Sequence, residues 1–103
     1  MYTVIFITCS GKPEGIKIAK ALLTRKLVAC VNMVDKLDSF FWWEGKINQA
    51  KECLLIAKST RAKLDKITKV VKSLHSYEVP EIIGLPIAGG NRNYLDWING
   101  SIR

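Results

Sequence analysis

The feature that most constrains the fold is a pair of long extended segments joined by a tight turn. Residues 27–43 and 46–59 are rich in β-branched, aromatic and apolar residues, and Glu44 and Gly45 stand between them. Because glycine adopts positive φ without steric cost, this spacing predicts a hairpin. The polar run from Asp35 to Asp38 predicts a bulge or bend in its first strand. The hairpin is too long for one small sheet, so its tip is expected to extend beyond the other strands.

The flanking segments predict the remaining elements. Residues 2–8 and 82–88 have the composition of strands, and residues 14–25 repeat apolar side chains at helical spacing. A second helix is expected after residue 60 and a short third helix after residue 91, and Ser10, Ser59 or Thr60, and Asn91 are the candidate caps. The order β-α-β-β-α-β-α predicts an α+β fold, the ferredoxin-like split βαβ sandwich with an added C-terminal helix. We expect one domain over residues 1–103, with an antiparallel sheet and its helices on one face.

Two of the expected strands are apolar on both faces. Residues 4–7 and 53–57 do not alternate between apolar and polar side chains, as strands with one solvated face would. A chain this short has no spare layer to cover the second face, which indicates a homo-oligomer. The four consecutive aromatic residues 40–43, at the end of the hairpin, also favour contact with another subunit, although packing within the chain is an alternative.

Net charge does not identify a partner. The chain carries +7, and a basic surface attracts polyanions without specific contacts. However, basic residues recur at steps of two and three between Arg61 and Lys72, which is typical of the solvated side of an amphipathic helix. Residues 52–58 also lack the aromatic side chains on which RNA-recognition modules stack bases. We therefore expect no nucleic-acid partner.

Targeting signals and disulfides are not expected either. No apolar run approaches the roughly 20 residues that span a bilayer, and the chain opens on a strand-like segment rather than a signal peptide. These features predict no membrane partner and a cytoplasmic location. Cys9, Cys30 and Cys53 are odd in number, widely spaced and set in apolar segments, so we expect small buried side chains rather than disulfides or a CxxC zinc site.

The segment 74–82 gathers more site chemistry than any other. It holds the only histidine, His75, together with Tyr77, Glu78 and Glu81, and Pro80 biases the backbone toward extended geometry. Imidazole and carboxylates can ligate a metal or transfer protons. The alternative is structural: a histidine that bonds the last carbonyls of a helix, with solvated glutamates. Spacing alone leaves both interpretations open.

Five stretches resemble one known family. They are residues 27–32, residues 39–47, Glu52 with Lys58, residues 75–82 and residues 94–98. In this order and spacing they resemble the CutA divalent-cation tolerance proteins over nearly the whole chain. The resemblance implies a tight trimer similar in plan to the PII signalling proteins, with hairpins extended across neighbouring subunits. It also implies a link to tolerance of copper and other divalent cations in bacteria, and to acetylcholinesterase anchoring in animal relatives.

Several positions depart from the family pattern. The first loop reads Ser10-Gly11, the His-Pro-Tyr motif is His75-Ser76-Tyr77, and the common hairpin tyrosine is Phe41. The cysteine and the first of two adjacent histidines, taken as ligands in copper-binding relatives, are Ile7 and Leu74 here. A lone imidazole makes a weak site, so His75 is expected to need Cys30, Glu81, Glu78 or a neighbouring subunit to hold Cu(II) or another divalent cation.

Two functions remain open, and a third is disfavoured. The first is a trimeric divalent-cation tolerance protein with its metal site, His75, Cys30 and Glu81, at subunit clefts. The alternative is a sensor that binds a small anionic metabolite in a cleft and signals to a protein partner. Catalysis is not expected, because no nucleophile pair, phosphate loop or HExxH motif is present. The residues predicted to line the ligand cleft are Trp43, Glu52, Lys58, Tyr77 and Glu78.

Overall fold

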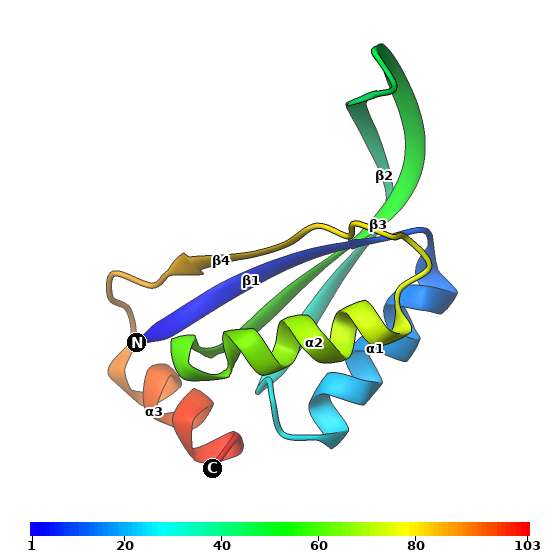
Figure 1. Cartoon of the computed structure of the whole chain (residues 1–103). Coiled ribbons are helices and arrows are strands. Elements are labelled where there is room, and N and C mark those ends of the chain that lie inside the picture. The colour runs from blue at the N-terminus through cyan, green and yellow to red at the C-terminus, as the bar shows by residue number, and fades with distance from the viewer.

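The computed structural model describes all 103 residues, and its elements follow the predicted order (Figure 1). The sheet has the order β2-β3-β1-β4, and every pair of neighbouring strands is antiparallel. This arrangement confirms the ferredoxin-like prediction. The elements are β1 (Tyr2–Cys9), α1 (Lys12–Thr24), β2 (Cys30–Trp43), β3 (Lys46–Thr60), a 3₁₀ turn (Arg61–Lys63), α2 (Leu64–Leu74), β4 (Ile82–Pro86) and α3 (Arg92–Ser101).

The core lies between one face of the sheet and the helices α1 and α2. Alternate residues of β1 and β3 are buried, because successive side chains of a strand point to opposite faces. Ile5 and Leu55 represent these rows, and Ile18 of α1 and Ile67 of α2 pack against them with no exposed surface. The basic residues of the second helix predicted an amphipathic helix, and the buried side chains of Ile67 and Val71 confirm it.

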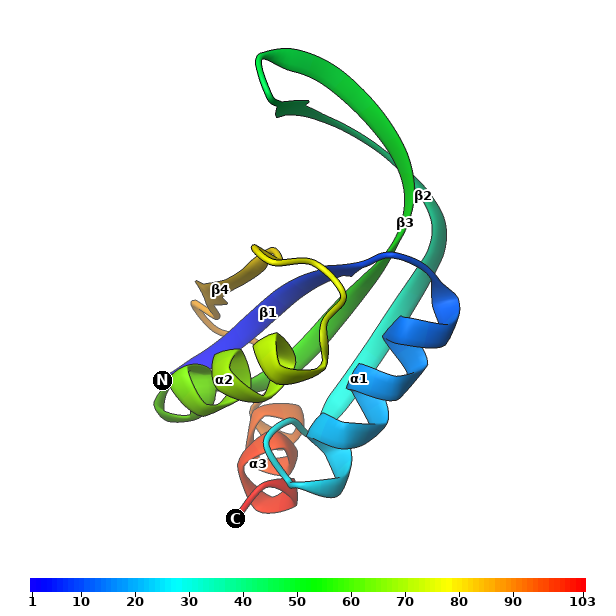
Figure 2. The same ribbon diagram turned by 45° about the vertical axis from the view of Figure 1, so that its right-hand side comes forward.

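The β2–β3 hairpin extends far beyond the rest of the sheet. Strand β1 pairs with β3 only from Cys53 to Thr60, so the part of the hairpin spanning residues 37–52, here called the arm, has no third strand beside it. Figure 2 shows the arm projecting from the sheet and bending over toward the side of the molecule where β4 lies. Glu44 and Gly45 have φ of 51° and 77°, and Trp43 pairs with Lys46, which confirms the predicted two-residue turn. The register shifts between Val34 and Leu37, which confirms the predicted irregularity.

The sheet face opposite α1 and α2 is only partly covered. Val4 pairs with Leu85 on this open face, and Leu85 remains 42% exposed. Val34 and Ile83 are 43% and 49% exposed, and at the end of the arm Trp42 is 73% exposed. An exposed apolar surface of this extent usually marks a contact site.

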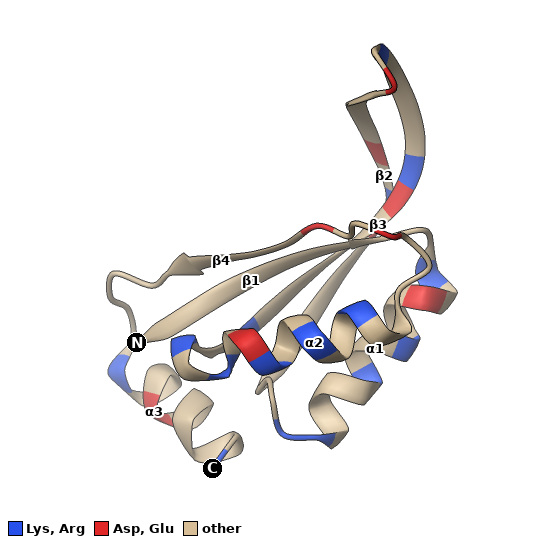
Figure 3. Cartoon of the chain, in the orientation of Figure 1, with Lys and Arg blue, Asp and Glu red and all other residues tan.

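Charge is distributed unevenly over the molecule. Segments 12–26 and 61–72, which include α1 and α2, hold ten Lys or Arg residues and two Asp or Glu residues. In Figure 3 the basic residues lie along these helices, while acidic residues gather where the arm meets the loop before β4. The basic stripe predicted on the second helix is thus the outer side of the helical layer. None of the helices is both long and apolar enough to cross a membrane.

Several predicted boundaries and caps differ from the structure. Ser10 does not cap α1, because the N-cap position is Gly11, which has no side chain to accept a hydrogen bond. Ser59 does not cap the second helical segment, because its hydroxyl donates to the Leu27 carbonyl oxygen at 2.6 Å. Thr60, the other candidate, stands at the N-cap position of the 3₁₀ turn without a side-chain hydrogen bond. Strand β4 ends at Pro86, two residues early, and α3 continues to Ser101. The cap at Asn91 is confirmed, because its side-chain oxygen accepts from the backbone N–H of Asn93 at 2.9 Å.

Candidate functional site

A groove of about 890 Å³ lies where the arm leaves the body of the molecule. The arm supplies most of one wall, and the other comes from Thr8 at the end of β1 and from the loop that joins α2 to β4. The lining includes three carboxylates and no Lys or Arg, although the whole chain carries +7. The lining residues are Thr8, Ser39, Phe40, Phe41, Trp43, Asn48, Gln49, Glu52, Tyr77, Glu78, Val79 and Glu81.

The structure brings together most of the residues predicted for a ligand cleft. Trp43, Glu52, Tyr77 and Glu78 all line this groove, and so does Glu81, which was predicted as a metal ligand. They come from the arm and from the loop after α2, so they are far apart in the sequence although they are close together in the structure.

Lys58 does not belong to the groove within one chain. It lies six residues beyond Glu52 on β3, which is about 20 Å at 3.3 Å per residue. Its ammonium group contacts Asn32 Oδ1 and lies 3.9 Å from Cys30 Sγ, so the structure places Cys30 beside Lys58 and away from the groove. The predicted metal set of His75, Cys30 and Glu81 is therefore not assembled within a single chain.

Tyr77 fixes the wall of the groove at its base. The Tyr77 hydroxyl donates to Glu52 Oε2 at 2.8 Å, which ties the loop after α2 to the arm. Burial raises the pKa of Tyr77 to about 12, with further contributions from the hydrogen bond to Glu52 and from nearby negative charge. The phenol therefore stays protonated and remains a donor at neutral pH. This bond leaves the other oxygen of Glu52 available to a ligand.

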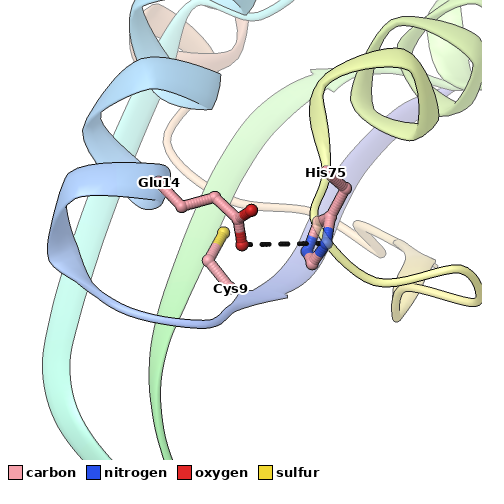
Figure 4. Close-up of side chains that lie close together, drawn as sticks. All are labelled: Cys9, Glu14 and His75. Atoms are coloured by element: carbon pink, nitrogen blue, oxygen red, sulfur yellow. Dashed lines mark ion pairs between the residues drawn. The ribbon is translucent and has the colours of Figure 1, made fainter.

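A second polar cluster lies beside the groove but does not line it. Cys9, Glu14 and His75 place their ligand atoms within 4.8 Å of one another, at the junction of β1, α1 and the loop after α2. Figure 4 shows the Glu14 carboxylate between the Cys9 thiol and the His75 ring. Glu14 Oε1 is 3.7 Å from His75 Nδ1. These are the residue types that bind transition metals, so the cluster must be tested as a metal site.

The ring nitrogens of His75 are both engaged within the protein. Nε2 lies 2.7 Å from the Thr8 carbonyl oxygen, and Nδ1 lies 3.0 Å from the backbone nitrogen of Tyr77. A carbonyl oxygen only accepts and a backbone N–H only donates, so these contacts fit the tautomer in which Nε2 donates and Nδ1 accepts. The side chain has no exposed surface. The structural interpretation of His75 therefore fits its surroundings, with β1 rather than the end of the helix as its carbonyl partner.

Glu14 is also saturated by hydrogen bonds. Its Oε1 accepts from the backbone N–H of Ser10 at 2.9 Å, and its Oε2 accepts from the backbone N–H of Ser76 at 2.7 Å. Burial acts to raise the pKa of Glu14, but these bonds outweigh it and lower the pKa from 4.5 to about 2. The carboxylate thus joins the start of α1 to the loop after α2.

This lowered pKa predicts an acid-sensitive fold. Since the ionised form of Glu14 is favoured in the folded state, its contribution is complete above about pH 4.5 and is lost as pH falls toward about 2. We expect the free energy of unfolding to decrease by up to about 3 kcal/mol over this interval. Urea unfolding of native protein at a series of pH values measures the change. Glu14→Gln should remove this part of the dependence of the unfolding free energy on pH, whereas Glu44→Gln, at the exposed turn, should not. An equal pH dependence in all three proteins would show that Glu14 is not its source.

The cluster does not fit a metal ion. Burial raises the pKa of the Cys9 thiol to about 12, with added repulsion from Cys53, Glu14 and Glu52, whereas a metal ligand must be a thiolate. An ion would also have to displace a hydrogen bond of His75 or Glu14. We therefore regard Cys9, Glu14 and His75 as a structural junction that positions the loop forming one wall of the groove.

Two groups of residues escaped the sequence prediction. Thr8, Ser39, Asn48 and Gln49 were missed in the groove because uncharged polar residues in strands carry no specific signal. Glu14 had a usable signal, since a glutamate in the first turn of a helix often accepts a backbone N–H at its start. The second hydrogen-bond partner of Glu14, the backbone N–H of Ser76, lies 62 residues away and had no such signal.

Comparison with known proteins identifies the family. The model for the CutA1 divalent ion tolerance protein matches residues 3–101. The chain belongs to this family. It is 46% identical over 98 residues to the divalent-cation tolerance protein CutA of Thermus thermophilus, and 95% of each chain is covered. The structure of the periplasmic divalent cation tolerance protein CutA from Archaeoglobus fulgidus superposes with a TM-score of 0.97 at 43% identity, covering 100% of both chains.

The CutA1 relatives correct one prediction, the cytoplasmic location. The rice relative, 45% identical over 97% of this chain, is named chloroplastic, and the Archaeoglobus fulgidus protein is described as periplasmic. This chain spans 56% of the length of the rice protein, so the matched domain says nothing of any targeting segment in the rest. The absence of a targeting signal in the matched region was therefore not a sufficient basis for predicting a cytoplasmic location. The CutA1 family is named for tolerance of divalent ions and not for a reaction.

Proposed function

We propose that this chain acts in divalent-cation tolerance as a homotrimer that binds the cation weakly in the groove beside the arm. The observation that carries the proposal is the lining of this groove by Glu52, Glu78 and Glu81, without a basic residue, in a chain of net charge +7. Such a lining attracts cations and disfavours the small anionic metabolite of the alternative hypothesis.

The donor atoms of the groove suit a weakly held ion. Carboxylate and amide oxygens from Glu52, Asn48 and Gln49 are hard ligands, and neither imidazole nor thiolate lines the groove. For a given set of such ligands, Cu(II) binds more tightly than Zn(II) and Mn(II). We expect affinities on the order of micromolar or weaker, because Glu78 and Glu81 are solvent-exposed.

The trimer is supported by exposed apolar surface on both the sheet and the arm. Trp42 pairs with Ile47 across the arm, and they are 73% and 67% exposed. Neither of them lines the groove, so these two side chains are available to a neighbouring subunit. The partly covered sheet face, with Val34, Ile83 and Leu85, offers a second contact area. Neighbouring subunits would then border the groove and complete the cleft.

Calorimetric titration with Cu(II), Zn(II) and Mn(II) tests the proposal. Removing one negative charge about 4 Å from a divalent ion costs on the order of 2 kcal/mol even in a water-like dielectric. We therefore expect Glu52→Gln and Glu81→Gln each to weaken binding about tenfold or more. Asp65→Asn, an equal change on the exposed side of α2, is the matched control. An equal loss in the control, or no loss in either groove variant, would exclude the groove as the site.

A further inference from the structure

The groove is larger and more apolar than a metal ion requires. Its volume is about 890 Å³, within the range of small-molecule pockets, and its walls include Phe40, Phe41, Trp43 and Val79. Metal ions gain nothing from such walls, since they are bound by a few oxygen, nitrogen or sulfur atoms. The apolar part of the lining therefore needs another explanation.

The charged and aromatic parts of the lining are separated along the arm. Phe41 pairs with Asn48, which lies four residues from Glu52 on β3, or about 13 Å at 3.3 Å per residue. Phe41 and Trp43 are two residues apart, so they project from the same face of β2. Glu52 marks the base of the groove, where Tyr77 holds it at 2.8 Å, and the aromatic rings lie toward the tip.

We infer that this groove binds an elongated organic dication with an apolar body, of the chemical class of linear aliphatic diamines. One ammonium group pairs with the carboxylates of Glu52, Glu78 and Glu81, the methylene chain lies along the apolar wall, and the second ammonium group is held by the aromatic faces of Phe41 and Trp43. One chain contributes no Lys or Arg to the lining, so none of its own basic side chains competes for these carboxylates. This inference does not depend on divalent-cation binding, although the two ligands would share the carboxylates.

The test compares two probes of matched length, 1,8-diaminooctane and the neutral 1,8-octanediol. Binding to the native protein is followed by calorimetry and by NMR shifts of the groove residues. We expect the diamine to bind more than about tenfold tighter than the diol, because only the diamine gains both an ion pair with the carboxylates and a cation–π contact with the aromatic rings. Trp43→Leu should weaken diamine binding about two- to fivefold and leave Mn(II) binding unchanged. Glu81→Gln should weaken both.

The controls separate this inference from the proposed function. Trp97→Leu removes an exposed tryptophan of α3 outside the groove, and it should bind the diamine as the native protein does. Equal binding of diamine and diol, or native affinity in Trp43→Leu, would overturn the inference. Diamine binding with the expected variant pattern, but without measurable binding of Cu(II), Zn(II) or Mn(II), would contradict the proposed function and leave this inference standing.

Discussion

His75→Ala is expected to lower the free energy of unfolding by about 3–5 kcal/mol. The change removes the partners of two backbone groups, the Thr8 carbonyl and the Tyr77 N–H, and each buried group left unpaired costs about 1–3 kcal/mol. It also leaves a cavity, since the ring has no exposed surface. Urea unfolding at about pH 7 measures the loss. A cost below about 1 kcal/mol would show that the junction of Cys9, Glu14 and His75 contributes little to stability.

Two conservative variants divide this effect. Asparagine at this position can still accept from the Tyr77 N–H, and glutamine can still donate to the Thr8 carbonyl oxygen. We expect His75→Asn and His75→Gln each to recover part of the loss, because each restores one of the two hydrogen bonds. If neither variant is more stable than His75→Ala, the two hydrogen bonds do not account for the stability that His75 contributes. The packing volume of the ring would then be its source.

Trp42→Ala is expected to dissociate the proposed trimer. An indole buried against a neighbour contributes about 3 kcal/mol or more, which corresponds to more than about a hundredfold in the association constant of each subunit contact. Trp42 is 73% exposed in the single chain, so the folded protomer itself should lose little. Light scattering at micromolar concentration should give three times 11.6 kDa for the native protein and a smaller mass for the variant.

Leu23→Ala is the matched control for assembly. Leu23 is 41% exposed on α1, away from the arm, so its truncation should leave the mass unchanged. A monomeric native protein would contradict the assembly argument directly. A trimer that persists in Trp42→Ala would shift the contact to the partly covered sheet face, where Ile83→Glu is the corresponding test.

Local patterns predicted the fold well because each depends on neighbouring residues. The β-rich composition of residues 2–8, the amphipathic pattern of α2 and the Glu44-Gly45 turn all express short-range preferences. The capping prediction failed at Ser59 because its hydroxyl donates to the Leu27 carbonyl oxygen, a partner 32 residues away. Tertiary contacts of this kind override local preference and leave no sequence pattern.

The candidate site was predictable in part for the same reason. The clustering of Tyr77, Glu78 and Glu81 in one segment identified one wall of the groove. The ligand role assigned to His75 rested on its being the only imidazole. Nothing local revealed that the Thr8 carbonyl oxygen, 67 residues away, accepts a hydrogen bond from its Nε2. Cys30 and Lys58 are neighbours across the β2–β3 ladder, but their distance from the groove depends on how far the arm extends, which local patterns do not give.

The two-residue turn at the end of the arm restricts how this protein can evolve. An insertion of one residue in β2 alone would reverse the faces of all arm residues beyond it. Phe41 and Trp43 would exchange sides with Phe40 and Trp42, and both the groove and the outer surface of the arm would change at once. Unless a bulge such as the one between Val34 and Leu37 absorbs the extra residue, the length of the arm can therefore vary between descendants of this chain only by matched, two-residue additions or deletions in both strands.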